Sequence, residues 1–167
     1  MEHFPNEIKN NIKDYIIYKP KNKDELQKAV DLWCENKYEA SQKYGDISLW
    51  DTSLITSMSC LFNECTYFND DISKWDVSNV QDMRAMFSNA RSFNQDLSSW
   101  DVSNVRIMGS LFRNAQSFNK PLGSWNLSNI SDMGEMFYDA SSFNQTQSLN
   151  NWNLNLGLGG NIIYIKD

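Results

Sequence analysis

The chain has 167 residues, a formal net charge of −6 and a pI near 4.7. This length suits one domain with a sizeable core and is too short for two domains joined by linkers. The acidic balance argues against a nucleic acid or an anionic membrane as the partner, because both call for a basic patch.

The N-terminal sequence, MEHFPNEIKNNIKDY, has neither the apolar segment nor the small-residue cleavage site of a secretory signal. No stretch approaches the run of about twenty apolar residues that a membrane-spanning helix needs. We therefore expect an intracellular or virion-associated location for the chain as given.

Residues 1–49 are predicted to form a helical cap. Within them, the segment 24–43 carries apolar residues at near-helical spacing, and Asp24 suits the start of a helix. We expect this helix to cover the first repeat, with Trp33 as its anchor. The upstream stretch IKNNIKDYIIY is predicted to be a second helix, or a helix that runs into a strand.

Tryptophan recurs every 25 residues through the middle of the chain, and whole segments recur with it: Trp50, Trp75, Trp100 and Trp125. A period of this length is typical of a stacked repeat, in which each unit covers the apolar side of its neighbour. We therefore assign four 25-residue repeats to residues 50–148.

Each repeat is predicted to contain a short helix and a short strand. The helix is indicated by apolar residues at i, i+3, i+4 and i+7, which are Met83, Met86, Phe87 and Ala90 in the second repeat. The strand is indicated by three alternate residues on one face, which are Phe93, Gln95 and Leu97. Successive strands would pair in parallel through right-handed crossovers.

Residues 149–167 alternate apolar and polar residues around three glycines, which predicts a C-terminal cap formed by a β-hairpin, with 162–165 as its closing strand.

An asparagine follows the same phenylalanine in every repeat: Asn69, Asn94, Asn119 and Asn144. We interpret the row as a buried ladder that bonds backbone groups between repeats. A ligand-binding row is the alternative. The four tryptophans receive a similar interpretation, as core packing that sets the spacing of the repeats, with an aromatic row that stacks sugars or bases as the alternative.

The unit W-D-V-S-N-V-x-x-M-x-x-M-F-x-x-A-x-x-F-N-x-x-L resembles the repeat of the BspA-like leucine-rich-repeat family, also known as the domain of unknown function 285 of mycoplasma-type surface proteins. The resemblance covers residues 50–148. It implies a leucine-rich-repeat-like solenoid with a role in adhesion or protein binding. The fold class expected is therefore a right-handed solenoid of short parallel strands alternating with short helices, capped by helices at one end and a hairpin at the other.

The chain offers little catalytic or metal-binding chemistry. Its one histidine, His3, lies near the terminus, so catalysis by a histidine base is excluded. Cys65 is interpreted as a small core residue, and a Cys60–Cys65 disulfide is the alternative. The aspartates that follow tryptophan or lie beside the strand could bind Ca²⁺, but aspartates bonded to their own turns are the preferred interpretation. We expect no enzyme activity, no cofactor and no metal.

Partner contacts are predicted at positions that vary between repeats beside the strand. One column comprises Asp70, Gln95, Lys120 and Gln145, and a second comprises Lys74, Ser99 and Ser124. Their charges change along the stack without forming a field of one sign, which suits a protein partner better than a polyanion.

Three functions follow from these observations. The first is a non-catalytic protein–protein interaction module, with no nucleic acid or membrane as partner. The second is a structural component of a larger assembly such as a virus particle, which leaves self-assembly open. The third is a carbohydrate-binding or adhesion module.

Overall fold

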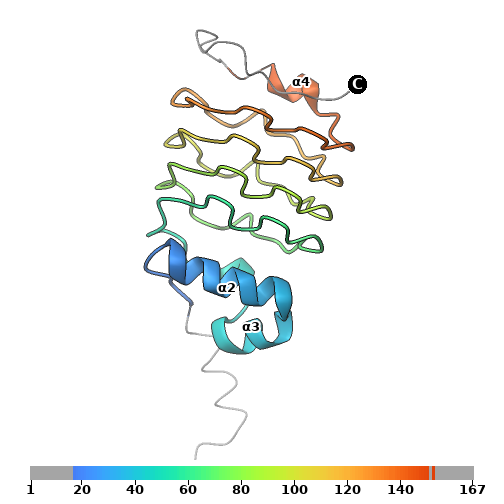
Figure 1. The fold of residues 1–167 in the computed structure, drawn as a ribbon. Coiled ribbons are helices and arrows are strands. Elements are labelled where there is room, and N and C mark those ends of the chain that lie inside the picture. Colours follow the sequence, from blue (N-terminus) through green and yellow to red (C-terminus); the bar gives the residue numbers. More distant parts are fainter. Residues whose placement is uncertain (1–16, 151, 153–167) are drawn as a thin grey trace, which may run out of the picture.

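The structure is a computed structural model that describes residues 17–150 and 152. Two helices, α2 (Lys23–Glu35) and α3 (Lys37–Tyr44), precede a 3₁₀ turn, η1 (Ile47–Leu49), and a short helix, α4 (Thr146–Leu149), comes last. Figure 1 shows α2 and α3 at one end of a pile of coils and α4 at the other. No helix in the described part of the chain has the length and apolarity needed to cross a lipid bilayer.

Each repeat forms one coil of the pile, and neighbouring coils are joined by backbone hydrogen bonds. The Met58 N–H donates to Asp82 O and the Phe62 N–H donates to Met86 O, both at 2.8 Å. The same bonds recur from coil to coil along the stack. They give only isolated parallel bridges, at Ser57–Asp82 and its equivalents, and no strand within the described residues.

The predicted alternation of strands and helices is therefore wrong, and with it the leucine-rich-repeat-like fold class and its right-handed crossovers. The segment expected to be helical forms overlapping turns, such as Met86 N–H to Met83 O at 3.2 Å and Ala90 N–H to Phe87 O at 3.1 Å. Ala85 and Asn89 have φ values of 52° and 60°. An α-helix needs negative φ at every residue and bonds from i to i−4, so this segment cannot be one.

The core consists of columns of identical or similar side chains. Phe62, Phe87, Phe112 and Phe137 stack with ring centroids 5.5–5.6 Å apart. A second column of phenylalanines lies beside it, with centroids 5.8–6.0 Å apart. Burial of each ring contributes about 1.5–3 kcal/mol, so most of the stability arises between coils.

The helix expected over 24–43 is two helices. Asn36 ends α2 and begins α3, and its Oδ1 accepts from the Glu39 N–H at 3.1 Å. The first helix is capped by Asn22, whose Oδ1 accepts from the Glu25 N–H, rather than by Asp24. Trp33 contacts the first coil as expected, because its buried ring lies edge-on to Trp50 at 5.7 Å.

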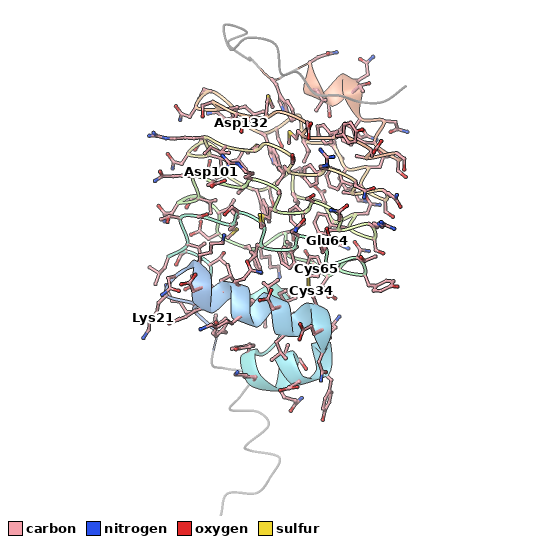
Figure 2. All side chains as sticks on the ribbon, in the orientation of Figure 1. Lys21, Cys34, Glu64, Cys65, Asp101 and Asp132 are labelled. Carbon is pink, nitrogen blue, oxygen red and sulfur yellow. A yellow bond between two sulfur atoms is a disulfide. The ribbon has the colours of Figure 1, made fainter. Side chains whose placement is uncertain are left out.

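The cysteine assignments are also corrected. Cys65 is half-buried and forms a disulfide with Cys34 at the end of α2, while Cys60 is exposed and free. The two bonded residues are 5.8 Å apart at Cα, within the normal range for a disulfide. Figure 2 shows this bond where the helical end meets the first coil.

The predicted C-terminal hairpin lies outside the described residues. Of the predicted cap, the structure describes Leu149 at the end of α4, Asn150 and Trp152. Trp152 is buried, and its Nε1 donates to Leu122 O at 2.9 Å.

Candidate protein-interaction surface

The four tryptophans are buried in the stack and do not form an accessible aromatic row. Trp75 Nε1 donates to Ile47 O at 2.8 Å, and Trp100 and Trp125 make the same bond to the coil before them. Trp50 lies under the rings of α2 and α3, and its buried Nε1 has no hydrogen-bond partner within the described part of the chain. A sugar or base could reach none of these rings without opening the core.

The asparagine row bonds coil to coil, but at the surface. Asn69 Oδ1 accepts from the Asn94 N–H at 2.8 Å, and the bond repeats from Asn94 to Asn119 and from Asn119 to Asn144. The end members are exposed and the middle two are half-buried, so the expected burial is wrong. The amide oxygens of Asn69, Asn94 and Asn119 already accept backbone N–H groups, and that of Asn144 accepts from Gln145 Nε2.

The first predicted partner column is largely occupied by contacts within the chain. Asp70 accepts from Trp33 Nε1 at 2.8 Å and from Lys37 Nζ at 2.5 Å, so it fastens the helices to the first coil. Gln95 Nε2 donates to Asn69 O at 2.7 Å, and two coils later Gln145 Nε2 donates to Asn119 Oδ1 and Asn144 Oδ1.

Lys120, the remaining member of that column, is half-buried, and its charge contributes to the lowered pKa of Asp96. In the second column, Ser99 Oγ donates to Ser73 O at 3.1 Å and Ser124 Oγ donates to Ser98 O at 2.8 Å. Lys74 is exposed. The two lysines are the members of these columns that remain available to a partner.

The aspartates that follow tryptophan are bonded to their own turns. Asp76 Oδ1 accepts from the Ser78 N–H at 3.0 Å, and hydrogen bonds from Ser103 lower the pKa of Asp101. Asp51 accepts in addition from Lys19 Nζ at 2.7 Å, and this bond together with those from Ser53 lowers the pKa of Asp51 to about 2. Within the described ranges, no three His, Cys, Asp or Glu side chains are placed to hold a metal ion.

The overlapping turns within each coil form a different surface. We define the turn face as the outward side chains of residues 56–67 and of the equivalent segments 81–92, 106–117 and 131–142. All four arginines of the chain lie on it, in the second and third coils: Arg84, Arg91, Arg106 and Arg113. They are seven residues apart within a coil and twenty-two residues apart between coils.

Two tyrosines flank these arginines. Tyr67, in the first coil, is 90% exposed, and Tyr138, in the fourth coil, is 38% exposed. The Arg113 guanidinium lies 4.5 Å from the Tyr138 ring centroid and forms an ion pair with Glu135. The side chains of the other three arginines are exposed and make no ion pair with any described residue.

The sequence reasoning missed this face because it looked for function beside a predicted strand. The available signal was the distribution of one residue type, since arginine is confined to two of the four repeats. Arginine and tyrosine are both enriched where proteins bind one another.

The comparisons with known proteins give a family. The model of a family described as Mycoplasma protein of unknown function, DUF285, matches residues 33–153. The chain belongs to the DUF285 family. No curated protein and no solved structure matches it. The match in this DUF285 protein includes the four coils, all of α3 and only the last turn of α2, so both arginine-bearing coils lie inside the family region.

Proposed function

We propose that this DUF285 protein is a non-catalytic protein-interaction module that binds its partner through the turn face. One observation carries the proposal: all four arginines and two exposed tyrosines gather on outward positions where only Arg113 has an ionic partner among the described residues. Side chains of these two types supply much of the binding energy in protein interfaces.

The polar side chains elsewhere on the coils support this choice of face. The asparagine row, the serines of the second column and the two glutamines of the first column all bond the next or the previous coil. A residue that holds the stack together cannot also vary freely to suit a partner. On the turn face, Asn89 and Asn114 also bond the previous coil, and Arg113 pairs with Glu135 of the next. The exposed side chains of Arg84, Arg91 and Arg106 form no ion pair with the described residues.

The proposal excludes an enzyme. None of the aspartates of the coils is buried, and those with a lowered pKa are stabilised as carboxylates by neighbouring hydroxyl, amide or ammonium groups. A general acid or base near neutral pH would need the opposite shift. The resemblance to BspA-like repeats adds independent support, because protein binding and adhesion are the roles inferred for that family.

The disulfide bears on the location. Disulfides persist on virion and cell surfaces and in other oxidising compartments, and they are rare in reducing ones. Of the two locations expected from the sequence, the Cys34–Cys65 bond therefore favours the virion-associated one. An assay of free thiols on protein from its natural source would test this, with one reactive thiol expected, from Cys60, and three if the location is reducing.

The test uses bulky substitutions that block a surface without changing its arginines. The immobilised chain captures partners from an extract of its source cells, and the captured protein is purified and titrated against each variant. Gln81→Trp with Gln116→Trp blocks the turn face, and Lys74→Trp with Ser99→Trp blocks the second predicted column as a matched control.

We expect the turn-face variant to bind at least about tenfold more weakly, which corresponds to about 1.4 kcal/mol, and the control to bind as the parent does. Weaker binding by the control variant alone would show that the partner binds at the predicted columns and not at the turn face. A parent chain that captures no saturable partner would overturn the proposed function itself.

A further inference from the structure

The arginines of the turn face form two pairs, each of which spans the second and third coils. The Arg106 N–H donates to Gln81 O at 2.9 Å, so Arg106 lies one coil above Gln81. Gln81 is three residues before Arg84. The Asn89 N–H donates to Arg113 O at 2.8 Å, which places Arg113 above a residue two positions before Arg91. The backbones of the two arginines of each pair therefore lie close together on neighbouring coils, and the two pairs belong to the same turn segments.

These two coils carry positive charge in an acidic chain. On their turn face, Asp82 is the one carboxylate beside the four arginines, and its Oδ1 accepts from the Arg84 backbone N–H. The turn face of the first coil carries Glu64, and that of the fourth carries Asp132, Glu135 and Asp139. The positive patch is thus bounded by negative charge at both ends of the stack.

The choice of arginine is specific to this patch. Every other basic side chain of the chain, apart from the one histidine, is a lysine, and coils two and three have no lysine on the turn face. Arginine differs from lysine by its planar guanidinium, which binds a carboxylate through two parallel hydrogen bonds. A surface that needed only positive charge would have no reason to exclude lysine.

We propose that the arginines of the second and third coils bind a short acidic segment of a protein partner, rich in aspartate and glutamate. The inference rests on the proposed function and names the chemistry of the partner. The segment would lie across the two coils with its carboxylates paired to the guanidinium groups, and Tyr67 and Tyr138 offer apolar surface at its two sides.

A nucleic acid fits the same patch less well. A polyanion that extends beyond two coils meets Glu64 at one end and the carboxylates of the fourth coil at the other. The net charge of −6 also opposes a long polyanion from a distance. A short acidic segment can end before it reaches either negative border.

The test measures binding of a fluorescent peptide of alternating glutamate and serine by anisotropy at low salt, with the same peptide carrying glutamine as the uncharged probe. The variant replaces all four arginines: Arg84→Gln, Arg91→Gln, Arg106→Gln and Arg113→Gln. The matched control removes four positive charges elsewhere: Lys21→Gln, Lys28→Gln, Lys74→Gln and Lys120→Gln. A second variant changes the four arginines to lysine. Melting curves establish that every protein is folded.

We expect the parent to bind the glutamate peptide and not the glutamine peptide. The arginine-to-glutamine variant should bind at least about tenfold more weakly, the lysine control within about twofold, and the arginine-to-lysine variant between them. Equal affinity of parent and arginine-to-glutamine variant, or no measurable binding by the parent, overturns the inference. Tighter binding of a single-stranded oligonucleotide than of the peptide also overturns it.

The two proposals fail in different ways. If the parent does not bind the acidic peptide but binding of its captured partner still requires the turn face, only the proposed acidic chemistry of the partner is wrong. If the parent captures no partner and does not bind the peptide, the proposed function is wrong as well.

Discussion

In each coil, a buried phenylalanine is followed directly by a residue of the turn segment, and the two positions behave differently along the stack. The first position is phenylalanine four times, at Phe62, Phe87, Phe112 and Phe137. The second position is Asn63, Ser88, Arg113 and Tyr138, and of these four residues only Ser88 is buried. Rings stacked at 5.5–5.6 Å need the same ring above and below, whereas the turn face has no such requirement. The repeat in the sequence therefore reflects the packing of the stack, and binding residues are expected at the positions that do not repeat.

The largest effect should come from the interior. Phe112 is buried, with ring centroids 3.9 Å from Phe118 and 5.6 Å from both Phe87 and Phe137. Phe112→Ala should lower the free energy of unfolding by about 3–5 kcal/mol, because the neighbouring rings cannot close the cavity. Urea unfolding measures it. Arg113→Ala, at the next residue, is the control and should cost less than about 1 kcal/mol. Equal losses of unfolding free energy for Phe112→Ala and Arg113→Ala would show that the two positions do not differ in structural role.

The disulfide joins the helical end to the first coil and should have the next largest effect. Cys34→Ser or Cys65→Ser opens a link between residues that are 31 apart in sequence, which should cost roughly 3–4 kcal/mol of unfolding free energy. Reduction with dithiothreitol should give the same loss in the parent and none in either variant. Cys60→Ser is the control and should leave stability unchanged, since that thiol is exposed and free. A parent that melts at the same temperature when reduced would show that the bond does not stabilise this junction.

The surface ladder should contribute less than either. Asn94 Oδ1 accepts from the Asn119 N–H at 2.9 Å at a half-buried position, so Asn94→Ala should cost about 0.5–1.5 kcal/mol. Asn94→Asp keeps an oxygen acceptor at this place and should recover most of that loss. Thermal melts of the two variants distinguish them. If aspartate is as harmful as alanine, the oxygen is not what the ladder uses.

The first coil offers a small effect that depends on pH. Lys19 and Ser53 lower the pKa of Asp51 from its ordinary value of 3.8 to about 2. A carboxyl whose pKa is lower in the folded state stabilises the fold above the unfolded pKa and ceases to do so as pH falls through the folded one. The contribution of Asp51 should therefore be lost between about pH 4 and pH 2, and Lys19→Gln should move its titration back towards 3.8. Carbon-detected NMR titration follows the carboxyl directly. An unshifted Asp51 in the parent would contradict the contact.

The sequence predicted the inward residues well and the backbone between them poorly. Tryptophan, methionine and phenylalanine at the repeating positions are buried almost throughout, as their recurrence indicated. The spacing of Met83, Met86, Phe87 and Ala90 predicted a helix, but a series of overlapping turns brings the same residues inward. The left-handed position at Ala85 gives no signal in the sequence, because alanine is not typical of that conformation. The one at Asn89 gives a weak signal, because asparagine tolerates left-handed φ better than most residues.

The candidate site was predicted less well than the core. Asp70, Gln95 and Gln145 vary between repeats, which suggested recognition, but they bond to neighbouring parts of the chain. Variation in sequence cannot distinguish a residue that meets a partner from one that fits a local neighbour. The Cys34–Cys65 bond was missed for a related reason, because Cys65 occupies a position that is alanine in the other coils and resembled a core residue.

The central claim is that the four arginines of the turn face do not hold the stack together. It is tested most directly by the free energy of unfolding of the chain in which all four arginines are changed to glutamine. Three of these side chains are exposed without an ionic partner among the described residues, and the fourth has a surface pair worth about 0.2–1 kcal/mol. We predict a value within about 1 kcal/mol of the parent by urea unfolding. A loss of about 3 kcal/mol or more, comparable with Phe112→Ala, would show that the turn face holds the stack together and would contradict the account.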